Sequence, residues 1–179
     1  MAHPSLVAAT ERYNAPARLL HWLVAVLVLV VWPVGAVIKF VKEDVKLTFY
    51  MVHESLGFVI LWLMLARLAV RLIAPPPPEP PMPAIFVKTA GVVHGLLYLV
   101  LILQPITGFL ATNAHGFPLE WFWTFPIWSP IGKSPDIAPT LSFVHVVLGW
   151  SVLVLFALHM GGVLFHHVLR RDTTLYRML

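Results

Sequence analysis

Five histidines lie within or just inside long apolar stretches of this 179-residue sequence: His21, His53, His94, His145 and His159. An ionisable side chain in hydrocarbon is costly, and it usually faces the interior of a helix bundle beside a partner. A neutral imidazole can also bind a transition metal through one of its ring nitrogens. The five histidines are therefore the first candidates for chemistry, although any one of them could instead form a simple hydrogen bond between helices.

The spacing of these histidines predicts two levels of paired side chains. His145 and His159 are 14 residues apart, so on one helix they lie on nearly the same face, about 21 Å apart along the axis. If the helices alternate in direction, His53 and His145 are the pair available at the outer level. At the inner level His21, His94 and His159 compete for two positions, and spacing alone does not choose between them.

Two histidine pairs stacked across a bilayer suit haem b. The iron takes two axial imidazoles, and the flat apolar macrocycle fills the space between helices. A small residue follows one turn after three of the histidines, namely Ala25, Gly57 and Gly149, where it would let a porphyrin approach the backbone. Close packing between membrane helices explains small residues equally well, and the pattern fails after His159, where Val163 stands at that position.

Two arginines are placed where haem propionates would need cations. Arg67 is 14 residues beyond His53 and therefore on the same helix face at the inner level, and Arg18 is about one turn before His21. Charge-assisted hydrogen bonds from such arginines would hold a carboxylate. Arginines are also common at the cytoplasmic end of a span without any ligand.

The elements that must position these residues are apolar segments of about 20 residues, long enough to cross a bilayer. The expected spans are residues 19–38, 51–72, 89–112 and 139–166. Eight basic residues flank the spans on one side and four on the other, which predicts that both termini are cytoplasmic. We therefore expect residues 1–179 to form a single domain, an all-α membrane protein in which a four-transmembrane-helix bundle encloses two haem groups.

The composition excludes several other classes of protein. Hydrophobic residues make up 59% of the chain and charged residues 11%, against about 45–50% and about 25% in soluble domains. The absence of cysteine excludes disulfides, iron–sulfur clusters, thiolate-ligated haem and covalent c-type haem. The net charge of +4 comes from residues scattered between apolar runs, so no continuous basic face is expected for nucleic acid.

Several segments together resemble one known family. They are Arg18 to Trp22, His53 with Gly57, a proline-rich loop near residues 75–83, His94 to Tyr98, and the closing segment from His166 to Met178. On these residues the chain resembles the bacterial cytochrome b-561 family, small four-helix di-haem proteins of the bacterial inner membrane. The resemblance implies that His21 and His159 ligate an inner haem, that His53 and His145 ligate an outer one, and that His94 is not a ligand.

The family includes an enzyme that oxidises superoxide and passes the electron to ubiquinone, and the resemblance implies this oxidoreductase activity, with no protein partner required. Quinone would approach from the lipid bilayer. His166 is the candidate proton donor for quinone, because it lies seven residues after His159 and near the cytoplasmic interface; an interfacial histidine without a role is the alternative. The alternative function is a cytochrome b anchor subunit that passes electrons between a dehydrogenase or hydrogenase and the quinone pool.

Overall fold

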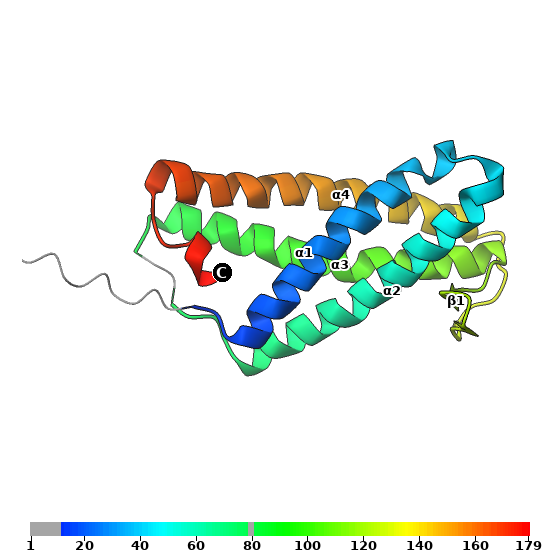
Figure 1. The fold of residues 1–179 in the computed structure, drawn as a ribbon, viewed down its shortest axis with the longest axis horizontal. Helices are drawn as coiled ribbons and strands as arrows, with labels where there is room; N and C mark the ends of the chain where they lie inside the picture. The colour runs from blue at the N-terminus through cyan, green and yellow to red at the C-terminus, as the bar shows by residue number, and fades with distance from the viewer. Residues whose placement is uncertain (1–11, 79–80) are drawn as a thin grey trace, which may run out of the picture.

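The computed structural model describes residues 12–78 and 81–179, which form four long helices (Figure 1). Helix α1 is Ala15–Val37, α2 is Glu43–Ile73, α3 is Ala84–His115 and α4 is Ala138–Leu164. All four are long and apolar enough to cross a membrane. Helix α1 packs along α2, α3 packs along α4, and α2 also contacts α3. The expected all-α architecture with four membrane-spanning helices is therefore confirmed.

All four helical segments extend beyond the apolar segments that predicted them, and α1 begins four residues earlier, at Ala15. Helix α2 begins at Glu43, before the apolar segment starts. Its first turn contains Glu43 and Asp44, and acidic residues there are stabilised by the helix dipole. Helix α3 begins directly after Pro83, and α4 continues as the π-helix η2, Phe165–Arg170. Short 3-10 turns, η1 at Ile38–Phe40 and η3 at Leu175–Arg177, follow α1 and η2.

The buried apolar core forms a thin layer between the two levels of histidines. One cluster joins α1 and α2 through Val24, Val31, Ile60 and Met64. A second joins α3 and α4 through Val100, Val152 and Leu155. Many other large apolar side chains are exposed on the helix surfaces, as expected for a chain whose outer faces contact lipid rather than water.

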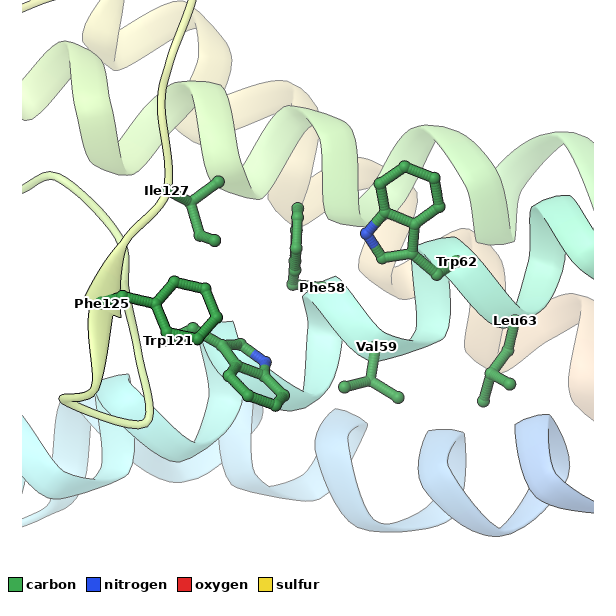
Figure 2. A pocket seen from close by; sticks show the side chains of 7 residues that line it. All are labelled: Phe58, Val59, Trp62, Leu63, Trp121, Phe125 and Ile127. Atoms are coloured by element: carbon green, nitrogen blue, oxygen red, sulfur yellow. The ribbon is translucent and has the colours of Figure 1, made fainter.

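The loop after α3 contains a short antiparallel hairpin that the sequence did not predict, β1 at Glu120–Trp121 and β2 at Phe125–Pro126. The hairpin is fixed to α2, because the backbone N–H of Phe122 donates to the buried Ser55 hydroxyl over 2.9 Å. Trp121 and Phe125 of the hairpin face α2 and line an apolar groove there, with Trp62 on the helix side (Figure 2).

The C-terminal segment holds the opposite end of the bundle together. Arg177 is 4% exposed, and its guanidinium donates to the carbonyls of Pro77 and Pro78 over 2.7 and 2.9 Å. Its own carbonyl accepts from the Tyr13 N–H over 3.1 Å, and the Trp22 indole donates to Met178 O over 2.9 Å. The start of α1, the proline-rich loop and the end of the chain therefore meet at one end of the molecule (Figure 1).

Replacing Arg177 with alanine is expected to destabilise this end of the bundle by about 2 kcal/mol, because two carbonyls lose a charged donor. For a chain of this size that corresponds to a fall in melting temperature of roughly 5 °C, measurable by thermal unfolding in detergent. The control is Arg171→Ala, which removes the same charge from an exposed position and should leave the melting temperature unchanged. Equal melting temperatures for both variants would contradict this role of Arg177.

Candidate haem-binding site

The structure brings His53 of α2 and His145 of α4 together at the outer level, with ring centres 6.1 Å apart. Two imidazoles that bind one metal ion from opposite sides, each through a bond of about 2 Å, place their ring centres about 6 Å apart. Nδ1 of His53 lies 3.0 Å from the Val31 carbonyl, and Nδ1 of His145 lies 3.0 Å from the Gln104 carbonyl. A carbonyl only accepts, so each Nδ1 donates and leaves Nε2 available as a metal ligand.

All three inner candidates meet at the other level. The ring centres of His21 and His159 are 6.2 Å apart, and those of His94 and His159 are 5.4 Å apart. The first distance resembles that of the outer pair, whereas the second is shorter. Arg67 also reaches this level, where its guanidinium donates to His21 Nδ1 over 2.9 Å and to the Tyr98 hydroxyl over 3.0 Å.

Buried polar atoms without partners lie beside both pairs. In the described part of the chain, Arg18 Nε and Gln104 Oε1 are buried and make no hydrogen bond. Arg18 stands one turn before His21, and the Gln104 amide nitrogen is 3.3 Å from His145 Nε2. A buried donor without an acceptor is costly, so the unpartnered Arg18 Nε fits a site in which a propionate would supply the acceptor.

The donor set also fits haem b. Within residues 12–78 and 81–179, no three His, Cys, Asp or Glu side chains converge to hold a metal ion. A zinc site built by the protein alone needs three or four such ligands, whereas a haem iron needs only two axial ones. A Cβ at Gly57, one turn after His53, would meet nothing within 4 Å, so no protein atom packs closely against the backbone there.

The comparisons with known proteins agree with this geometry. The sequence profile of the family described as prokaryotic cytochrome b561 matches residues 12–179. The chain belongs to this family. It is 32% identical over 172 residues to the probable superoxide oxidase CybB of Yersinia pestis, covering 94% of this chain and 96% of that protein. It is 30% identical over 184 residues to cytochrome b561 homolog 2 of Escherichia coli (strain K12), covering 98% and 95%.

Cytochrome b562 of Cereibacter sphaeroides is a more distant relative, 26% identical over 166 residues, with 89% of this chain and 90% of that protein covered. Membership of the family establishes the general function of this chain. It is a multi-pass protein of the bacterial inner membrane that binds haem b and transfers electrons. The resemblance drawn from the sequence is thus confirmed, whereas the assignment of individual ligands stays a prediction.

The proposed proton donor His166 lies in a polar cluster at the end of α4. Its Nδ1 is 2.6 Å from Asp172 Oδ2, and Arg170 Nε donates to the same oxygen over 3.1 Å. Burial alone would raise the pKa of Asp172, but hydrogen bonds from His166 and Thr174 lower it to about 2. Asp172 is therefore a carboxylate at every physiological pH and orients the His166 ring.

Sequence reasoning missed two glycines and a glutamine around the outer pair. A Cβ at Gly35 would lie 2.4 Å from His53 Cε1, and one at Gly108 would lie 2.7 Å from His145 Cε1. Gln104 supplies both the carbonyl and the amide that contact His145. All three are on α1 or α3, the helices beside those that carry the histidines. The spacing of residues along one helix therefore gave no signal for them.

Proposed function

We propose that this cytochrome binds two haem b groups, the outer one between His53 and His145 and the inner one between His21 and His159. The observation that carries this proposal is the pair of ring-centre distances, 6.1 Å and 6.2 Å, at two levels of one bundle. Each haem would supply an iron that gains and loses one electron. Arg67 is positioned to hold a propionate of the inner group, because its guanidinium lies beside His21 without a carboxylate partner among the described residues. Arg18 is the second candidate through its unpartnered Nε, while its Nη1 donates to the Leu179 oxygen.

We further propose that electrons come from superoxide on the periplasmic side and go to ubiquinone. Two superoxide anions would each lose one electron to become two molecules of oxygen, and one quinone would take both electrons and two protons to become quinol. The name of the relative from Yersinia pestis, a probable superoxide oxidase, supports this choice. Lys39 and Lys42 lie in the outer turn after α1, where positive charge would attract an anion; the third lysine there, Lys46, is paired with Glu43.

On the inner side, His166 is the proposed proton donor to quinone. Asp172 holds its Nδ1, and no hydrogen bond within the described residues occupies its Nε2. A carboxylate bonded to Nδ1 fixes the ring, so that Nε2 is held in a constant orientation for a proton transfer. This arrangement supports a role for His166 beyond that of an interfacial histidine, and a His166→Asn variant is expected to slow quinol formation more than 10-fold while superoxide still reduces the haem.

The direct test of this function supplies superoxide enzymatically to the purified protein in liposomes with a short-chain ubiquinone. The expected result is one quinol formed for every two superoxide anions consumed, followed in the ultraviolet, with no hydrogen peroxide from the protein itself. The matched control is protein prepared without haem, which should form no quinol. Superoxide consumption that yields hydrogen peroxide instead of quinol would contradict the proposal.

The anchor-subunit alternative requires a docking surface for a second protein. Trp123 and Trp128 in the outer loop are 54% and 82% exposed, so aromatic surface is available there, although Trp121 and Phe125 fold onto α2 (Figure 2). Exposed tryptophans are also typical of a membrane interface. Purification in a mild detergent distinguishes the two functions. A hydrophilic protein that co-purifies in a stoichiometric amount would favour the anchor subunit, and a chain that purifies alone would favour the free-standing enzyme.

A further inference from the structure

The ring of each outer histidine packs against a glycine of a neighbouring helix, an arrangement that we call a glycine slot. The ring of His53 lies against Gly35 of α1, and the ring of His145 lies against Gly108 of α3. In each slot the carbonyl that accepts from Nδ1 belongs to the residue four positions before the glycine. The missing Cβ lets the imidazole edge approach the helix closely enough for this bond. The slot therefore fixes both the orientation and the tautomer of each ring.

A carbonyl that accepts from Nδ1–H makes the imidazole a more basic ligand. A more basic ligand stabilises the oxidised iron and so lowers the reduction potential. Both outer histidines have such a bond, over 3.0 Å in each case.

The inner pair, unlike the outer pair, lies beside a cation. The Arg67 guanidinium lies 2.9 Å from His21 Nδ1, whereas within the described residues no arginine or lysine is hydrogen-bonded to His53 or His145. When His21 binds iron through Nε2 and carries its proton on Nδ1, Arg67 still has the Tyr98 hydroxyl as an acceptor. Its charge then stays at the inner level. A cation near the iron favours the reduced state, because reduction adds negative charge.

We propose that these surroundings give the outer haem a lower reduction potential than the inner haem, so that electron transfer is downhill from the outer level to the inner one. Arg67 is the positioning residue that raises the inner potential, and the slots at Gly35 and Gly108 lower the outer one. This inference rests on the proposed function, because it requires both haem groups. It adds the order of the two reduction potentials and the residues that set it, which the pairing of the histidines does not assign.

The test is a potentiometric titration of the purified protein, with the two components assigned through His145→Ala, which should retain only the inner haem. The expected result is two one-electron components, of which the variant lacks the one with the lower potential. Equal potentials, or loss of the higher component in the variant, would overturn the inference while leaving two bound haems in place. A haem content below two per chain would overturn the proposed function as well, and haem analysis distinguishes these cases.

Two pairs of variants test the residues themselves. Arg67→Gln should lower the inner potential, and Arg67→Lys, which keeps the charge, should restore most of it. Gly108→Ala should alter the electron paramagnetic resonance signal of the outer haem and raise its potential, whereas Gly91→Ala on the same helix, where a Cβ meets nothing within 4 Å, should change neither. An unchanged inner potential in Arg67→Gln, or equal effects of the two glycine variants, would overturn the assignment of these residues.

Discussion

Replacing His145 with alanine is expected to reduce the haem content from two groups per chain to one, with loss of the outer group alone. Its ring faces His53 at 6.1 Å, and among residues 12–78 and 81–179 no other histidine ring contacts His53. A haem with one axial histidine loses half of the protein's bonds to its iron, so retention in detergent should fail. The inner pair is separated from this level by the buried apolar layer and should keep its haem.

The measurement is haem content together with a reduced-minus-oxidised spectrum of the purified variant. His53→Ala should behave in the same way. His115→Ala is the matched control, since His115 is the exposed last residue of α3 and is bonded to Ser142, and this variant should retain both haems. Loss of both haems from His145→Ala in a protein that remains folded would show that the two levels are not independent.

Replacing His159 with alanine is expected to remove the inner haem, whichever histidine is its partner. His159 is the shared member of the inner cluster, with ring centres 6.2 Å from His21 and 5.4 Å from His94. The partner is decided by the two other single variants. His21→Ala should lose the inner haem and His94→Ala should keep it, because the longer distance is the one that leaves room for a metal ion between the rings.

The haem content of each variant identifies the partner of His159, and the outer haem serves as an internal reference in every sample. If His94→Ala loses the inner haem and His21→Ala retains it, then His94 is the ligand and the assignment implied by the family is wrong. A thermal unfolding measurement on each variant separates ligand loss from loss of the fold. The expected fall in melting temperature is larger for His21→Ala, which loses the haem that stabilises the folded state, than for His94→Ala.

The sequence predicts those features of this protein that depend on the order of residues along a single helix. The four helices follow from the length of the apolar segments, and the pairing of His53 with His145 follows from their depth. The helix ends were less accurate, because windows of hydropathy stop at the first charges whereas α2 continues to Glu43. The location of both termini in the cytoplasm stays a prediction, although Tyr13 and Arg177 do lie at the same end of the bundle.

Features that depend on contacts between helices could not be predicted in this way. The glycine slots at Gly35 and Gly108 face histidines of other helices, and the reach of Arg67 to His21 crosses from α2 to α1. The buried Arg177 joins segments about 100 residues apart in the chain. Each of these contacts depends on how two packed helices are rotated and shifted relative to each other. The periodicity of residues along one helix does not determine that arrangement.

Two pairs of histidines in one chain are proposed to hold two haem b groups. The ratio of haem to protein in the purified chain tests this directly, measured by the pyridine haemochrome assay after expression with sufficient haem. The expected ratio is two b-type haems per chain. A ratio of one would contradict the claim of two complete sites, and a ratio near zero would show that these histidines serve only to pack the helices.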